Sequence, residues 1–270
     1  MGVDHPEPHN IKNYLMFEEV SQFYKKIASD PNHRYRSWEH CYMFFKSSEK
    51  TNLDLAALNL GFYLASWGMY RGSSFLLQKD YKVHVGAIRI IQEYDVLHGI
   101  SLEAFTENVD LLFKLIEQLK AYYKKIKSLV PHLDNEKDTT DTLITKVIMG
   151  TLGCIPAYDR FFIEGIRSTK ELKYSELNKT NFKALLKWCV NNPVPNNVRK
   201  DIPAEYPIMK IIDMHFWRIG EIKLTNDAIK KSKKELESLD TLNSLDRKQS
   251  LRKKHLEQKL SQYRDILDGK

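Results

Sequence analysis

Apolar residues recur at helical spacing along most of this chain. The clearest example follows Ser101, where apolar residues between Leu102 and about Leu129 obey an i, i+3, i+4 pattern. The segment 82–96 has a similar pattern, although its valines and isoleucines leave a β-strand as an alternative. The same period predicts further helices over residues 11–28, 33–46, 142–149, 155–166, 181–189 and 206–219. The sequence therefore predicts an all-α fold with a multi-helix globular body.

The longest apolar segment extends from Leu53 to Leu77. Asp54, Asn59 and Arg71 interrupt it, so the segment does not have the continuous apolar character of a membrane span. We interpret it as a helix of the protein core that begins at Leu53, and we expect no membrane partner.

Two polar segments divide the expected helices. Residues 134–141, DNEKDTTD, are the most polar linker, and they predict a subdomain boundary near residues 131–141. Residues 190–207, VNNPVPNNVRKDIPAEYP, concentrate proline and asparagine, which disfavour regular helix. We expect this second segment to be an ordered loop or a hinge.

The last fifty residues differ from the rest of the chain. Residues 221–270 contain thirteen Lys or Arg against nine Asp or Glu, so they carry +4 of the net charge of +7. Leucines at every third position drift around a helix, which predicts a break over residues 238–246. We therefore expect a body of residues 1–220 and a charged helical tail of residues 221–270, forming a hairpin or a coil. Residues 224–267 pack on the body, mediate self-association or partner binding, or form a nucleic-acid-binding arm.

The composition excludes several classes of protein. Of the 270 residues, 42% are hydrophobic and 11% aromatic, which favours a packed globule over a disordered chain. Cys41, Cys154 and Cys189 lie far apart without metal-ligand spacing, so we expect buried, reduced thiols and a cytoplasmic protein. The N-terminal residues lack a basic region followed by an apolar run, so no secretory signal is expected. No motif indicates a metal or a cofactor.

One arginine stands out within the apolar segment. Residues 64–76, LASWGMYRGSSFL, place Arg71 among aromatic and small residues. A buried charge without a partner costs several kcal/mol, so Arg71 requires one. We expect it either to pair with a carboxylate such as Asp159 or Asp213, or to bind an anionic ligand in a cleft. The candidate ligand-binding residues are Arg71, Trp67, Tyr70, Arg36 and Asp213.

A second candidate site lies in residues 33–45, HRYRSWEHCYMFF, where Arg34 precedes His40 by six residues. This spacing resembles the loose Arg-to-His motif of the HEPN ribonucleases. The resemblance implies metal-independent RNA cleavage, in which His40 assists proton transfer at the 2′-hydroxyl and Arg34 stabilises the phosphate charge. The alternative is an amphipathic helix whose charges are solvated or paired.

A third candidate is Asp159 in residues 150–167, GTLGCIPAYDRFFIEGIR. A proline-containing turn followed by an aspartate resembles the segment with the catalytic aspartate in helix-hairpin-helix DNA glycosylases. That resemblance implies a catalytic carboxylate at Asp159, which we expect one turn into a helix that has Pro156 in its first turn. The alternative is that Asp159 neutralises a buried cation, of which Arg71 is one candidate.

These patterns leave two classes of function open. The first is an α-helical binding or interaction protein, associated with nucleic acid or another anionic ligand through a cleft around Arg71. The second is a nucleic-acid-processing enzyme, either HEPN-like through Arg34 and His40 or glycosylase-like through Asp159. The sequence contains no specific catalytic motif, and it leaves open whether the protein is an enzyme.

Overall fold

The computed structural model describes residues 17–72, 74–131, 139–169, 172, 176–242, 244 and 246–267, and these form an all-α fold without a β-strand. The helices are α2 (Glu18–Ser29), α3 (Ser37–Lys46), α4 (Leu53–Ser66), α5 (Val85–Gln92), α6 (Leu102–Ser128), α7 (Asp141–Thr151), α8 (Arg160–Thr169), α9 (Lys179–Asn191), α10 (Asn196–Asp201), α11 (Ile208–Asp240) and α12 (Arg247–Leu267). Short 3₁₀ segments connect them, including η1 (Arg34–Arg36), η3 (Phe75–Gln78) and η4 (Tyr81–His84). The first sixteen residues, and residues 132–138 of the expected boundary, lie outside the described residues.

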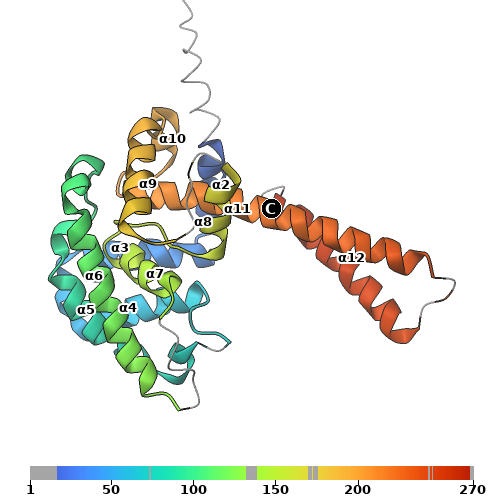
Figure 1. The fold of residues 1–270 in the computed structure, drawn as a ribbon, viewed down its shortest axis with the longest axis horizontal. Helices are drawn as coiled ribbons and strands as arrows, with labels where there is room; N and C mark the ends of the chain where they lie inside the picture. Colours follow the sequence, from blue (N-terminus) through green and yellow to red (C-terminus); the bar gives the residue numbers. More distant parts are fainter. Residues whose placement is uncertain are drawn as a thin grey trace, which may run out of the picture.

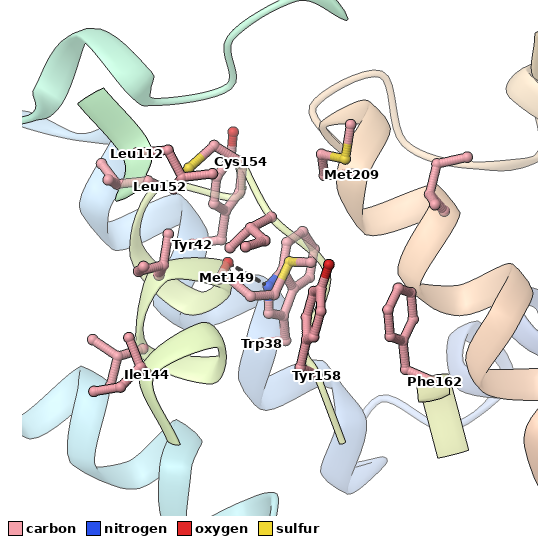
Figure 2. Packing of buried hydrophobic residues seen from close by; sticks show 14 of the residues in the cluster. Trp38, Tyr42, Leu112, Ile144, Met149, Leu152, Cys154, Tyr158, Phe162 and Met209 are labelled. Atoms are coloured by element: carbon pink, nitrogen blue, oxygen red, sulfur yellow. Dashed lines mark hydrogen bonds between the residues drawn. The ribbon is translucent and has the colours of Figure 1, made fainter. Parts of the chain in front are cut away.

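The body consists of two groups of helices. Figure 1 shows α3, α4, α5, α6 and α7 together, while α2 and α8 pack against α11, α10 packs against α2, and α9 contacts α6. Trp38 on α3 lies in the core between the groups, and its indole Nε1 donates a hydrogen bond to the Met149 carbonyl on α7 at 2.9 Å (Figure 2). Its ring also meets the Tyr206 ring edge-on, with 4.8 Å between centroids. One continuous core therefore joins both groups.

The apolar segment 53–77 is not a single helix, which corrects the sequence-based expectation. Helix α4 ends at Ser66, and Gly68 adopts a positive φ of 75°. The Gly68 amide donates to the Ala65 carbonyl and the Met69 amide to the Leu64 carbonyl, which is a Schellman motif. The chain then turns away and re-enters the core in η3. Among the described residues, no helix is both long enough and apolar enough to cross a bilayer.

The second half of the chain also departs from the expected boundaries. The loop predicted over residues 190–207 contains the short helix α10. Helix α11 continues beyond the expected helix end at residue 219, while the division of the chain into a body and a tail at residue 220 stays a prediction. Helix α12 returns beside α11, and ion pairs join Arg252 to Glu235 at 2.7 Å and Lys253 to Asp240 at 2.5 Å.

A buried histidine connects the loop after α4 to α6. His84 at the end of η4 has no solvent exposure. Its Nε2 lies 2.7 Å from the Tyr70 hydroxyl and its Nδ1 lies 2.8 Å from the Tyr123 hydroxyl. Burial lowers the pKa of His84 to about 3, because the protonated ring would lose its hydration. His84 is therefore neutral in the folded protein at neutral pH.

This burial predicts an acid-sensitive contribution to stability. His84 becomes protonated near pH 6.5 in the unfolded chain but only near pH 3 in the folded chain. As the pH falls between these values, the free energy of unfolding therefore decreases by about 1.4 kcal/mol per pH unit. From pH 7 to pH 5, the free energy of unfolding of the wild type, measured with urea, should fall by about 2 kcal/mol more than that of His84→Gln. Parallel pH profiles for the two proteins would contradict the assignment.

Candidate functional site

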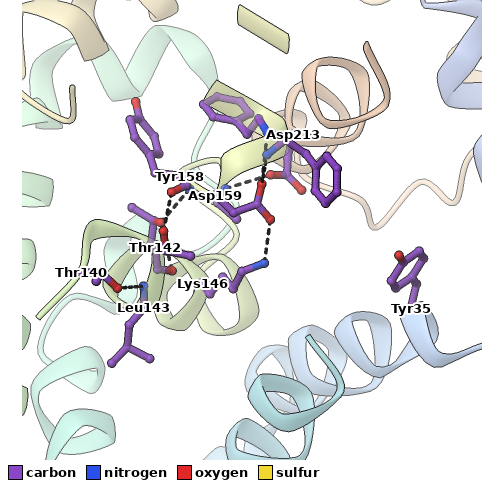
Figure 3. A network of polar contacts seen from close by, with 12 residues as sticks. Tyr35, Thr140, Thr142, Leu143, Lys146, Tyr158, Asp159 and Asp213 are labelled. Atoms are coloured by element: carbon purple, nitrogen blue, oxygen red, sulfur yellow. Dashed lines mark hydrogen bonds and ion pairs between the residues drawn. The ribbon is translucent and has the colours of Figure 1, made fainter. Parts of the chain in front are cut away.

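The most unusual feature of the core is a pair of buried ion pairs around Trp67. On α7, Lys146 contacts Asp159 at 3.0 Å (Figure 3). On α11, Lys210 contacts Asp213, also at 3.0 Å. Lys146 is 3% and Lys210 is 6% exposed. Their ammonium nitrogens lie 4.7 and 5.2 Å from the centre of the Trp67 ring. Both cations are therefore satisfied by a carboxylate and an aromatic face.

The two carboxylates also fix the backbone between α7 and α8. Asp159 Oδ1 accepts hydrogen bonds from the backbone N–H groups of Phe161 and Phe162, both at 3.1 Å. Asp159 thus caps the start of α8, which corrects its expected position one turn inside a helix. Asp213 Oδ1 accepts from the Ala157 N–H at 2.9 Å. Each carboxylate therefore has a lysine and at least one backbone partner.

Arg71 is not the cation that meets these carboxylates. Its side chain is exposed, and it lies over Gly68, where an added Cβ would be 3.0 Å from the Arg71 Nε. The Schellman turn at the end of α4 directs this part of the chain outward, and Lys146 and Lys210 take the buried positions. The expected ion pair of Arg71 with Asp159 or Asp213 is therefore replaced by two lysine pairs. Binding of a ligand by Arg71 stays a prediction.

The other predicted site residues are distributed over several contacts. Tyr70 contacts His84, as described above. Arg36 forms an ion pair with Glu39, 3.2 Å between Nε and Oε2. His40 is exposed on α3, and within the described part of the chain no hydrogen bond or ion pair joins it to Arg34. The structure brings together Asp159, Asp213 and Trp67, but it does not pair Arg34 with His40.

A pocket of about 740 Å³ lies at the base of the tail, between α2, η1, α8, α11 and the end of α12. We call it the basic pocket. Its aromatic wall consists of Phe23, Tyr35, Phe161 and Trp217, and its cationic lining includes Lys25, Lys26, Arg34 and Arg218. Asp30 and Glu221 are the acidic residues that line it. Cations thus outnumber carboxylates around an aromatic surface.

Tyr35 connects the basic pocket to the buried ion pairs. Its ring stacks on Trp67 with 4.6 Å between centroids and an angle of 24°. Trp217 meets the Tyr35 ring edge-on at 5.7 Å. Burial raises the pKa of Tyr35, so its phenol stays protonated at neutral pH. The aromatic wall is therefore backed by Trp67 and its two lysines rather than by a flexible surface loop.

The pocket cations differ in how they are already engaged. Lys25 pairs with Asp201 at 3.1 Å, and Arg218 pairs with Glu221 at 2.6 Å. Arg34 instead donates to the neutral Tyr35 hydroxyl at 2.8 Å. Its guanidinium carbon lies 4.6 Å from the centre of the Tyr35 ring. Among the described residues, no carboxylate pairs with Arg34, and its guanidinium lies in the pocket lining.

Comparisons with protein-family models, with curated proteins and with solved structures find no match to this chain. Within the described residues, no group of three or more His, Cys, Asp or Glu side chains is placed to hold a metal ion. The residues that sequence reasoning did not select are Tyr35, Lys146, Lys210 and Trp217. Lysines inside the apolar helices 142–149 and 206–219 are the signal that could have identified two of them.

Proposed function

We propose that this protein binds a nucleotide-class ligand, a planar base that carries a phosphate, and that the basic pocket holds it. The observation that carries the proposal is the presence of Arg34 beside the aromatic wall of one 740 Å³ pocket. A pocket of this size is within the usual range for small-molecule sites. The function is therefore that of a binding protein, the first of the two classes that the sequence leaves open.

The two parts of the pocket suit the two parts of such a ligand. Stacking of a base on an aromatic side chain is worth about 1–3 kcal/mol and tolerates any base, because every base has a π-face. The guanidinium of Arg34 can grip a phosphate with two parallel hydrogen bonds. Neutral aromatic ligands would leave Arg34 without an anionic partner, and inorganic phosphate would leave the aromatic wall unused. A nucleotide uses both.

Replacement of Arg34 by alanine should weaken nucleotide binding by about tenfold to a hundredfold, since hydrogen bonds to charged groups contribute about 1.5–3 kcal/mol. The probe is adenosine 5′-monophosphate, and the readout is the change in intrinsic tryptophan fluorescence, to which Trp217 in the pocket contributes with the three other tryptophans. Arg89→Ala is the matched control, because Arg89 is an exposed arginine on α5, which packs against α4 and α6. Its affinity should equal that of the wild type.

Three other results would redirect the proposal. Equal affinity of Arg34→Ala and the wild type would contradict binding in the basic pocket. A loss of binding in Arg71→Ala, with Arg34→Ala unaffected, would favour the cleft around Arg71. Cleavage of labelled RNA that is abolished by His40→Ala would favour the nucleic-acid-processing enzyme.

A further inference from the structure

The tail forms an arm on the body, in which α12 packs against α11. The arm consists of residues 222–240 of α11, α12 and the described residues between them, and its two helices project away from the other helices (Figure 1). Leu256 and Leu260 are buried in its seam. On its described residues, the large apolar side chains with substantial exposure are Leu242 at 44% and Leu251 at 61%. The outer surface therefore offers polar groups and little apolar area to a partner.

The two flanks of the arm differ in charge. Lys248, Arg252, His255 and Lys259 follow i, i+4, i+7, i+11 spacing and share one face of α12. Arg252 reaches Glu235 on α11 at 2.7 Å, and Lys231 lies one turn before Glu235 on the same helix face. We call Lys231, Lys248, Arg252, His255 and Lys259 the basic flank. Arg252, Lys231 and Lys259 together hold the pKa of the Glu235 carboxyl below its usual value. Glu235 thus has cationic partners, and so does Asp227, which lies one turn before Lys231 on α11 and pairs with Lys223.

The opposite flank is mixed in sign. There Lys253 pairs with Asp240 at 2.5 Å, and Glu257 lies one turn further along α12. Its cations are therefore interspersed with carboxylates. The basic flank therefore attracts a polyanion more strongly than the opposite flank does.

The arm and the basic pocket meet at the end of α12. Arg218, which lines the pocket, donates from Nη2 to the Ile266 carbonyl at 3.0 Å. Ile266 and Leu267 are themselves part of the pocket lining. Lys259 lies seven residues before Ile266, about 10 Å along the helix. A nucleic-acid strand that leaves the pocket can therefore reach the basic flank within a few nucleotides.

We propose that the basic flank binds the phosphate backbone of a single-stranded nucleic acid whose terminal nucleotide occupies the basic pocket. This inference rests on the proposed function, because it identifies the nucleotide in the pocket as the end of a strand. The charge of the flank favours a polyanion, and the lack of exposed apolar area disfavours insertion into a lipid surface. Backbone contacts of this kind bind DNA and RNA alike.

Two triple variants test the inference with the same change in net charge. Lys231→Gln/Lys248→Gln/Lys259→Gln neutralises the basic flank, and Lys233→Gln/Lys254→Gln/Arg264→Gln removes three exposed cations from the rest of the arm. The probes are 25-nucleotide oligo(dT) and oligo(rU), end-labelled for fluorescence anisotropy, and adenosine 5′-monophosphate. The first variant should bind the oligonucleotides about tenfold or more weakly at low salt, with a salt slope reduced by about 2, since each contact to a single strand contributes about 0.7. Its affinity for the mononucleotide should equal that of the wild type.

The control variant should bind oligonucleotides much more tightly than the flank variant. Equal affinities of the two triple variants would overturn the inference, because they would show a dependence on net charge alone. Flank-dependent binding to phosphatidylserine vesicles without binding to oligonucleotides would also overturn it, in favour of a membrane partner. Failure of the proposed function gives a different result, which is mononucleotide binding that is absent or insensitive to Arg34→Ala.

Discussion

Replacement of Gly165 by alanine should destabilise the body by about 3–5 kcal/mol, an exceptional cost for a single methyl group. Helices α8 and α11 approach each other so closely that a Cβ at Gly165 would lie 1.8 Å from the Phe216 carbonyl oxygen. On the opposite side of the same contact, a Cβ at Gly220 would lie 1.8 Å from the Phe161 carbonyl oxygen. Both obstacles are backbone atoms, so a side-chain rotation cannot relieve them. The two helices would have to separate.

Urea unfolding followed by circular dichroism measures this cost. Gly72→Ala is the matched control, because Gly72 has a positive φ of 58° and no atom within 4 Å of an added Cβ. It should lose only about 1–2 kcal/mol, the strain of a non-glycine residue in the left-handed region. A Gly165→Ala protein as stable as the wild type would disprove the backbone contact between α8 and α11. Because Phe161 and Trp217 line the basic pocket, the variant should also weaken binding there.

The helical content of the body could be predicted from the sequence, whereas several helix ends could not. The period of apolar residues identifies α6 almost to the residue, since Ser101 caps it and one face is continuously apolar. The same signal fails after Ser66, because apolar residues continue through the Schellman turn into η3. Periodicity detects a buried face, but it does not detect a change of chain direction inside the core.

The candidate site could be predicted only in part, because its pairings join distant positions. The sequence shows that Asp159 and Asp213 lie in apolar segments and require cations. It does not show that Lys146 and Lys210 meet at Trp67, since that encounter depends on how α7 and α11 pack against the end of α4. Arg34 was selected for its spacing to His40, yet the structure places it beside Tyr35 in the basic pocket. The environment of Arg34 is therefore set by its contact with Tyr35, and not by its sequence spacing to His40.

Replacement of Asp213 by alanine should cost about 3–5 kcal/mol of folding free energy, because Lys210 would stay buried without its counter-charge. The Ala157 N–H would lose its acceptor as well. Asp227→Ala is the matched control on the same helix. Asp227 pairs with Lys223 at an exposed position, so its removal should leave the urea midpoint almost unchanged.

The double variant Lys210→Met/Asp213→Leu distinguishes an uncompensated charge from a simple loss of packing. Replacement of a buried ion pair by apolar residues of similar volume is often neutral, so the double variant should be substantially more stable than Asp213→Ala. Recovery should remain incomplete, because the Ala157 N–H still has no acceptor. If the double variant is as unstable as Asp213→Ala, the cost arises from packing, and the buried charge of Lys210 is not its cause. If it recovers, nucleotide binding then tests whether the Lys210 charge behind Trp67 also supports the stacked Tyr35 ring of the basic pocket.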